Sequence, residues 1–384
     1  MSGHAKLSPS SAARWMTCPG SVTLSEGIKD VGSSNANEGT MMHAFAAKCL
    51  ETGTDAAGYV GQTDKETGLI LQDKQAKDVQ FYLDHVREIV AATGGELRVE
   101  QRLPIGWLTG EEDAHGTADA VIVTFDELII VDAKFGYKLV DADDNPQLMI
   151  YAAAAYDELK VAYDFKRVRI AISQPRLLAK PEFSFSMAEL YGFIEQVGAS
   201  AEQTRQQPDV FVPSSKACQW CRAKPVCPAL RQQVMDAFDE STPLADTPDD
   251  GLAYVMDRAD MIEAWIKSIR AEVERRLLAG EPVKGYKLVQ GKRGNRMWVN
   301  PVDAEAALKA MRVKHDQMYD YKLASPTSIE KLAKADEIGP RQWTKIQALI
   351  TQSEGQPSVA PVSDKRPALV TSAAASDFDD VTNP

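Results

Sequence analysis

The order of apolar and polar residues predicts a chain in which strands and helices alternate. Alternation with a period of two marks strands, and apolar residues spaced three or four positions apart mark amphipathic helices. The predicted strands are 97–105, 116–124, 128–134, 167–173 and 182–186. The predicted helices are 8–18, one from about 37 to 50, 72–92, one opening at 146, 187–206, 252–278, 303–312 and 326–352, with a second hairpin at 286–290 and 296–299. This pattern indicates an α/β fold.

The second and third of these strands form a β-hairpin with a tight turn at Asp126-Glu127. A two-residue loop there places Asp119 opposite Lys134, with Asp132 one diagonal step away on the same face. The rest of the hairpin is apolar, and charges on such strands are costly to bury unless they bind a metal or pair with each other. The hairpin therefore predicts a site with two carboxylates and one ammonium group.

The helix that follows the hairpin adds polar side chains to this site. Asn145 is a favourable N-cap, and Pro146 fits the first helical position. Gln147 and Tyr151 are four residues apart and therefore share one face of the helix. For Tyr151 alone, packing in the core is an almost equally good interpretation.

Three segments in this order resemble the RecB-like branch of the PD-(D/E)XK nuclease superfamily: Gly116-Thr117-Ala118-Asp119, Asp132-Ala133-Lys134 and Gln147-x3-Tyr151. The family pattern is an Asp, a D/E-x-K strand and a Q-x3-Y helix. The D-x-K tripeptide alone carries little information, but the set on strand, strand and helix is fairly specific. The resemblance covers roughly residues 8–230. It implies a restriction-endonuclease-like core, with a mixed central sheet flanked by helices.

The resemblance also implies hydrolysis of phosphodiester bonds with Mg²⁺ or Mn²⁺. A divalent ion polarises the phosphate and supplies a nucleophile near neutral pH, and Mg²⁺ prefers hard oxygen ligands. The ligands that the resemblance implies are His43, Asp119, Asp132 and the backbone carbonyl of Ala133. Lys134 would orient the attacking water or stabilise the transition state, and Gln147 and Tyr151 would position the strand. The alternative for Asp132 and Lys134 is a cross-strand ion pair.

Two further candidates depend on position along the chain. By residue type alone, His43 is an ordinary helix histidine. The RecB-like family, however, has a metal-site histidine on a helix before the first strand, and Glu38-Gly39-x3-His43 occupies that place. The resemblance therefore favours His43 as a ligand, which suits Mn²⁺ somewhat better than Mg²⁺, and Glu38 as a supporting residue. Glu100 is either a further acid near the metal or an exposed strand carboxylate.

The segment Cys218-x2-Cys221-x5-Cys227 is typical of metal or cluster ligands in a reducing compartment. A tetrahedral site needs a fourth thiolate, which either Cys18 or Cys49 offers. Cys18 precedes Pro-Gly and is suited to a loop, whereas the apolar neighbours of Cys49 indicate a buried thiol.

One distant N-terminal cysteine with a C-terminal trio resembles the iron–sulfur subgroup of RecB-like nucleases, which includes the AddB-type and CRISPR-adaptation nucleases. The resemblance implies a [4Fe–4S] cluster that clamps the two ends of the nuclease domain together. The alternative is a structural Zn²⁺ ion on the same four cysteines. In either case we expect a structural role, because a fully thiolate-ligated centre keeps no open position for catalysis.

Composition changes this picture only in part. The 384 residues, 44% hydrophobic and 26% charged, are those of an ordinary globular protein with one large domain and a smaller region. No stretch approaches 18 uninterrupted apolar residues, and the N-terminus lacks a signal-peptide core. We therefore expect no membrane span and a location in the cytoplasm, where cysteines stay reduced. The resemblance implies that this is the cytoplasm of a bacterial host cell.

The net charge counts against simple nucleic-acid binding. The 43 basic and 55 acidic residues give −12, whereas nucleic-acid binders gain most of their affinity by neutralising phosphates. A local basic groove and a metal site remain compatible with this charge. We therefore expect modest unaided DNA binding or help from a partner. The chain has no Walker A motif and hence no built-in motor.

The chain is predicted to divide into a nuclease domain at 1–239, a mostly helical accessory region at 240–352 and a disordered tail at 353–384. Acidic, Pro-containing residues 240–250 form the linker, and the tail is rich in Ser, Pro, Ala and Asp. The basic tip of the second hairpin, 291–295, either tracks the DNA backbone or is a solvated turn.

These features together predict a metal-dependent DNA exonuclease of phage origin that resects duplex ends for recombination or replication. Its expected partners are DNA ends and a single-strand annealing or recombination protein. The resemblance favours 5′-to-3′ polarity, although no residue decides it. One alternative is a non-catalytic module that binds DNA ends or a partner, against which the intact Asp119, Asp132 and Lys134 argue. The other is a nuclease active only in a complex, which the net charge favours.

Overall fold

The computed structural model describes residues 5–28, 34–240, 249–287, 289, 301–312, 314–315, 319, 326–335 and 337–350. The chain forms two compact units, Met1–Gln290 and Gly291–Pro384. The predicted tail, most of the acidic linker, and the tip and second strand of the second hairpin lie outside the described residues.

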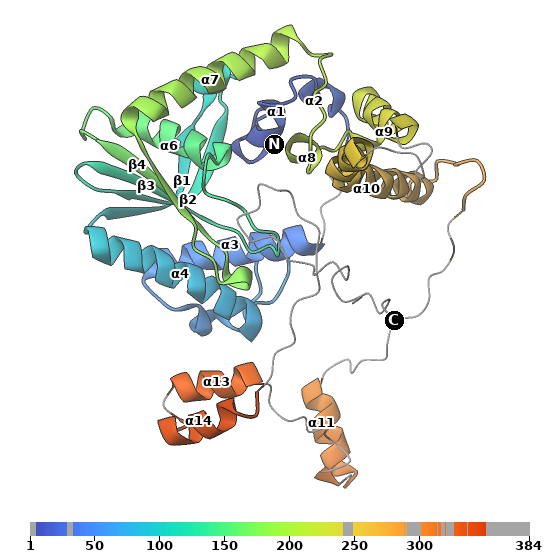
Figure 1. The fold of residues 1–384 in the computed structure, drawn as a ribbon. Coiled ribbons are helices and arrows are strands. Elements are labelled where there is room, and N and C mark those ends of the chain that lie inside the picture. Colours follow the sequence, from blue (N-terminus) through green and yellow to red (C-terminus); the bar gives the residue numbers. More distant parts are fainter. Residues whose placement is uncertain are drawn as a thin grey trace, which may run out of the picture. The chain divides into compact units, whose positions relative to one another are not determined.

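A five-stranded mixed sheet is the centre of the first unit (Figure 1). The strands are β1 (Glu96–Pro104), β2 (His115–Val123), β3 (Glu127–Ala133), β4 (Arg167–Ser173) and β5 (Glu182–Ser186), in that spatial order. Neighbouring strands are antiparallel except β3 and β4, which are parallel. A parallel pair needs a crossover connection, and α6 (Pro146–Leu159) lies between these strands in the chain. The predicted mixed sheet flanked by helices is confirmed.

Helices cover both faces of the sheet. The helices α3 (Ser34–Thr52) and α4 (Asp73–Thr93) contribute to one hydrophobic core, together with Ile122 and Ile129. The helices α6 and α7 (Met187–Gln206) contribute to the other core. Because the central strands are buried on both faces, their sequence is nearly continuously apolar.

The β2–β3 hairpin has a different register from the predicted one. Ala120 pairs with Val131, and one further step brings Asp119 opposite Asp132, so the prediction that Asp119 faces Lys134 is wrong. The shift is two residues, which leaves every side chain on its predicted face because strands have a period of two. Asp119 and Asp132 therefore still share one side of the hairpin.

Glu127 explains the error in the turn. Thr124 and Glu127 are hydrogen-bonded across the hairpin, so the tip consists of Phe125 and Asp126. Glu127 is buried in β3, where its carboxylate forms ion pairs of 2.9 Å with Arg167 and 3.2 Å with Arg169. The local sequence assigns Glu127 to the turn, but its ion pairs with β4 stabilise it as part of the strand.

Short helical turns connect the longer elements of the first unit. The helix predicted at 8–18 is instead two short turns, η1 (Pro9–Ser11) and α1 (Ala12–Trp15). The other short elements are α2 (Ser21–Leu24), η2 (Ala56–Tyr59), α5 (Gly106–Thr109), η3 (Pro175–Leu177), α8 (Ser215–Cys218) and η4 (Lys224–Val226).

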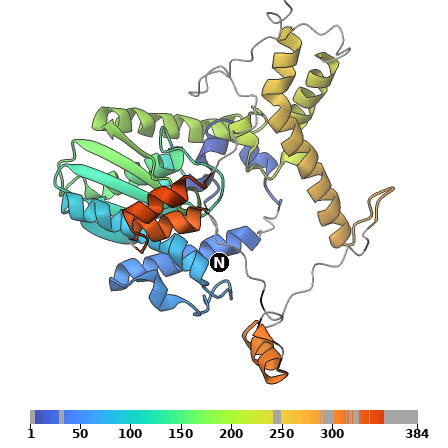
Figure 2. The same ribbon diagram turned by 60° about the horizontal axis from the view of Figure 1, so that its bottom comes forward.

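The helices α9 (Pro228–Glu240) and α10 (Asp249–Leu278) lie side by side (Figure 2). The unit boundary after 290 differs from the predicted one at 239/240, because α10 packs on α8, η4 and α9.

The second unit is helical where it is described. It contains α11 (Pro301–Ala310), α13 (Pro326–Lys334) and α14 (Pro340–Gln347), and α13 contacts α14. Where it is described, the helical region predicted at 326–352 is divided into α13 and α14, because Pro340 cannot occupy a helix interior and instead starts α14. Across the described part of both units, no helix has the length and apolar character needed to span a membrane.

Candidate functional site

One cavity of about 580 Å³ lies where the β2–β3 hairpin meets α3 and α6. All six of the predicted residues that carry the proposed chemistry through their side chains line it, and so does Glu100. The lining residues are Ala36, Gly39, Thr40, His43, Ala44, Ala47, Glu66, Glu100, Thr117, Asp119, Asp132, Lys134, Gln147 and Tyr151. Small residues of α3 form one wall, which leaves room beside His43.

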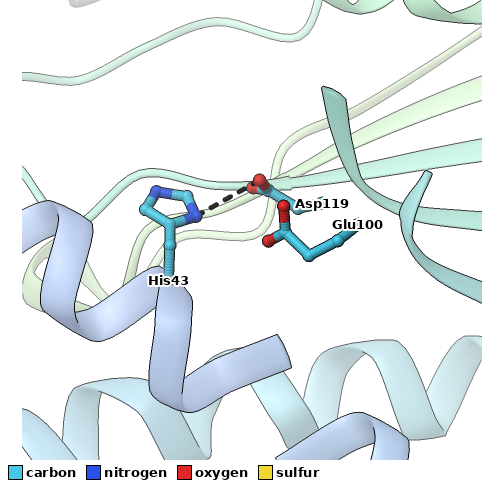
Figure 3. A group of neighbouring side chains, drawn as sticks. All are labelled: His43, Glu100 and Asp119. Atoms are coloured by element: carbon cyan, nitrogen blue, oxygen red, sulfur yellow. Dashed lines mark ion pairs between the residues drawn. The ribbon is translucent and has the colours of Figure 1, made fainter. Parts of the chain in front are cut away.

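Asp119 is the centre of the site. Its Oδ1 lies 3.2 Å from Nδ1 of His43 on α3, and its Oδ2 accepts a hydrogen bond of 2.7 Å from the backbone N–H of Ala133 (Figure 3). The second contact ties β2 to the end of β3 at the point where the regular pairing ends. Asp119 is therefore held from two directions by groups that stabilise its negative charge.

Glu100 approaches Asp119 from the neighbouring strand. It has a positive φ of 47°, an unfavourable conformation for a residue with a Cβ, and it interrupts the regular β1–β2 pairing. Figure 3 shows His43 and Glu100 directed toward Asp119 from opposite sides. One ligand atom from each of His43, Glu100 and Asp119 lies within 4.8 Å of the others. Glu100 thus takes the place in this group that the sequence assigned to Asp132.

Asp132 belongs to a second, adjoining group. Its Oδ2 is 2.5 Å from Nζ of Lys134, and its Oδ1 accepts a hydrogen bond of 3.4 Å from Nε2 of Gln147. The same amide group donates to the hydroxyl of Tyr151 at 3.3 Å. Gln147 is in position because the side chain of Asn145 accepts hydrogen bonds from the first turn of α6, as predicted for an N-cap.

Burial and like charge set the electrostatics of the site. Burial disfavours ionisation of both aspartates, but the charge of His43 and its hydrogen bond hold the pKa of Asp119 below its usual value. Burial and the nearby charge of Asp119 raise the pKa of Asp132, in spite of Lys134. Burial, together with Asp119, raises the pKa of Glu100 to about 7. The site therefore holds more carboxylates than its two cationic side chains, His43 and Lys134, neutralise.

The same carboxylates favour the charged forms of their partners. Burial opposes protonation of His43, yet Asp119 raises its pKa. Asp132 and Asp119 likewise raise the pKa of Lys134 against the effect of burial. Burial and the charge of Asp132 raise the pKa of Tyr151. Tyr151 thus remains a neutral hydroxyl at physiological pH.

Two residues differ from the sequence-based picture. Glu38 lies outside the cavity lining and forms an ion pair of 2.8 Å with Arg176, whose charge and hydrogen bond lower its pKa although burial opposes this. Glu66 lines the cavity from the irregular segment between η2 and α4, and sequence reasoning missed it. No periodic pattern or motif surrounds Glu66, so the sequence carries no signal for its position.

Four of the five cysteines gather at one place, and all five are free thiols. Cys18, Cys218, Cys221 and Cys227 line one small pocket, whereas Cys49 is fully buried in the core between α3 and α4, as predicted. The backbone N–H groups of Val212 and Leu230 donate to Sγ of Cys18 and Cys227 at 3.2 and 3.5 Å.

These cysteine sulfurs are not tightly grouped, and two positively charged side chains lie near them. Within the described part of the chain, no three cysteine sulfurs lie within 4.8 Å of one another. Two cations, Arg14 and Lys224, lie close enough to the cysteines to interact electrostatically with them.

Comparison with known proteins identifies the family of the chain. Among solved structures, the one described as "Crystal structure of SSO0001" is similar over 55% of this chain and 95% of that chain, with 14% identity and a TM-score of 0.23. This similarity is too low to establish a shared fold. The family described as "Protein of unknown function (DUF2800)" matches residues 4–367, and the chain therefore belongs to that family.

Proposed function

We propose that this protein is a metal-dependent DNA exonuclease of the iron–sulfur-containing, RecB-like PD-(D/E)XK type. The observation that carries the proposal is the convergence of His43, Glu100, Asp119, Asp132, Lys134, Gln147 and Tyr151 on one cavity. These residues come from three strands and two helices, so their convergence is not a consequence of local sequence. The proposal includes Mg²⁺ or Mn²⁺ as cofactor and DNA ends as substrate.

The donor set fits a divalent cation. Octahedral Mg²⁺ has ligands at 2.0–2.1 Å, which places neighbouring and opposite ligand atoms about 3 to 4 Å apart. The 4.8 Å grouping of His43, Glu100 and Asp119 comes close to this range. A cation would also stabilise the ionised forms of Glu100 and Asp132, whose pKa values burial and the charge of Asp119 raise. When bound, it would polarise the phosphate and make water a nucleophile near neutral pH.

Other side chains of the site would stabilise the reacting phosphate and position the groups around it. The pKa of Lys134 is raised by its neighbours, so its side chain is an ammonium cation, suited to stabilising negative charge on a reacting phosphate or to orienting water. Gln147 holds Asp132 and Tyr151 in place through one amide group.

The four cysteines that line one pocket offer a complete set of thiolate ligands. The family resemblance favours a [4Fe–4S] cluster over the alternative, a Zn²⁺ ion on the same four cysteines. Arg14 and Lys224 would offset the negative charge of the ligated thiolates.

The setting of this activity is proposed with it. A net charge of −12 is consistent with action beside a single-strand annealing or recombination protein in the bacterial cytoplasm, in phage recombination or replication. Polarity from 5′ to 3′ is favoured by the family resemblance alone. A non-catalytic DNA-end module is the alternative, and the retention of Lys134 beside Asp132 argues against it.

The decisive experiment is cleavage of end-labelled linear duplex by anaerobically purified protein with Mg²⁺ or Mn²⁺. We expect wild type to shorten the linear duplex and to leave closed circular DNA intact, and Asp132→Ala and Lys134→Ala to lose activity. Asp126→Ala and Lys166→Ala are matched controls, because both residues are exposed at the turn end of the hairpin. They should retain activity.

Other outcomes select the alternatives. Equal DNA binding by wild type and variants without any cleavage would favour the non-catalytic module. Cleavage that appears only after addition of an annealing protein would favour the complex-dependent nuclease. Stoichiometric zinc without iron in the same preparation would replace the cluster by a zinc site and leave the nuclease proposal unaffected.

A further inference from the structure

The loop that follows β3 presents two unusual side chains beside the site. Tyr137 is 65% exposed and Leu139 is 66% exposed, although both are large hydrophobic residues. Tyr137 follows Lys134 by three residues, so their Cα atoms are at most about 11 Å apart. The backbone of this exposed aromatic residue therefore lies close to a residue that lines the cavity.

Arg176 supports this ring from one side. Its guanidinium carbon lies 4.8 Å from the centre of the Tyr137 ring, a cation–π contact. Arg176 is 9% exposed and is held by ion pairs of 2.8 Å with Glu38 and 3.1 Å with Asp78. Glu38 and Asp78 thus hold the guanidinium group of Arg176 in place against the Tyr137 ring.

The loop backbone is fixed as well. The fully buried amide of Gln174 accepts a hydrogen bond of 3.0 Å from the N–H of Val140 and donates one of 2.9 Å to the carbonyl of Lys138. Nζ of Lys74 lies 3.4 Å from the Tyr137 hydroxyl. The ring is therefore held in position before any ligand arrives, while most of its surface remains exposed.

We propose that Tyr137 is a stacking platform for an unpaired nucleobase of the substrate strand, close to the phosphate that is cleaved. This inference rests on the proposed function, and it narrows the substrate to a single-stranded or frayed end. A base inside a duplex has both faces covered by its neighbours, whereas an unpaired base offers a face to an aromatic ring. Lys74 and Lys138 are exposed next to the ring and are available to the strand phosphates.

The platform also assigns a role to Glu38. The sequence places Glu38 near the metal, but its contact with Arg176 connects α3, which carries His43, to the support of Tyr137. One helix therefore positions both a candidate metal ligand and the base-stacking platform. This connection would keep the position of the stacked base constant relative to the scissile phosphate.

The test measures binding of a fluorescein-labelled single-stranded 12-mer by full-length protein, with Ca²⁺ in place of Mg²⁺ or Mn²⁺ to suppress cleavage. Tyr137→Ala should weaken binding on the order of tenfold, because stacking on an aromatic side chain contributes substantially per base. Tyr137→Phe keeps the ring and should bind like wild type. Phe125→Ala, which removes an 82% exposed aromatic residue at the hairpin tip, is the matched control and should have no effect.

A series of 12-mers, each with one abasic position, makes the test specific for stacking. At one position near the labelled end, loss of the base should weaken binding by wild type but not by Tyr137→Ala. The inference is overturned if Tyr137→Ala binds every oligonucleotide like wild type, if its deficit is the same at all abasic positions, or if wild type binds none of them.

Cleavage assays with Mn²⁺ on the same preparations separate the two proposals. Binding with the expected abasic pattern but without cleavage would remove the nuclease function and leave the platform. Cleavage by wild type with unchanged binding by Tyr137→Ala would remove the platform and leave the nuclease.

Discussion

Asp119 and Asp132 are buried carboxylates whose pKa values are shifted in opposite directions. The difference arises because His43 and the Ala133 N–H outweigh the effect of burial on Asp119, whereas burial and the charge of Asp119 outweigh Lys134 at Asp132. Glu100 adds a third carboxylate and retains this position in spite of a positive φ. At the residue scale, the three carboxylates of the site therefore repel one another, and a bound cation would reduce this repulsion.

Glu100→Gln should reveal this repulsion through pH. The folded-state pKa of about 7 lies above the usual value of 4.5, so between these values the folded protein holds a proton that the unfolded chain has released. Stability therefore falls as pH rises through this window. In EDTA, Glu100→Gln should have a higher melting temperature than wild type at pH 8, and the two should converge near pH 4.

The control for this prediction is Glu66→Gln, which alters another carboxyl in the lining of the same cavity. It should change the melting temperature little at either pH. A Glu100→Gln protein that is less stable than wild type at pH 8 would contradict the electrostatic account. Saturating Mn²⁺ should abolish or reverse the advantage of Glu100→Gln, because Glu100 would then gain from being ionised.

At the scale of elements, the start of α6 is the most important junction of the site. Asn145 caps this helix, and the next helical turn carries Gln147 and Tyr151 into the cavity. Capping stabilises the helix and also fixes the direction in which its first side chains point. Stability and site geometry therefore depend on the same side chain.

Asn145→Ala should lower the free energy of unfolding by about 1 kcal/mol, measured by urea denaturation, and should also reduce cleavage. Ser186→Ala is the matched variant, because Ser186 caps α7 through a capping box with Glu189, and neither residue lines the cavity. It should show a similar loss of stability with full activity. Equal activity of Asn145→Ala and Ser186→Ala would show that the N-cap of α6 does not determine the geometry of the site.

At the scale of the whole molecule, the cysteine pocket joins distant parts of the chain. Cys18 precedes the sheet in sequence, and Cys218, Cys221 and Cys227 follow it, so 200 residues separate Cys18 from Cys218. A metal centre there would close a long loop of the chain, and such links stabilise the folded state chiefly by restricting the unfolded one.

Cys18→Ser should therefore lose iron and lower the melting temperature by about 10 °C, if the link contributes about as much as a disulfide that closes a long loop. Cys49→Ala is the control, since Cys49 is buried in the core beside α4 and away from the other four cysteines. It should keep its iron. Iron content is measured by absorbance and metal analysis, and full iron in Cys18→Ser would contradict the ligand assignment.

The sequence by itself determined the elements and the faces on which their side chains lie. The five strands agree with the predicted ones to within one residue at each end, because apolar periodicity is a local property that burial on the sheet enforces. The grouping of Asp119, Asp132 and Lys134 on one side was also predictable. It survived the register error, since a shift of two residues preserves the face.

Only the tertiary structure decided the partners of individual charges. Glu127 lies in β3 and not in the turn because Arg167 and Arg169 of β4 pair with it. Glu38 lies outside the cavity lining, where it pairs with Arg176. The closeness of Glu100 to His43 and the gathering of the four cysteines likewise join segments far apart in the chain. A charged side chain accepts several partners of similar energy, so three-dimensional packing makes the choice.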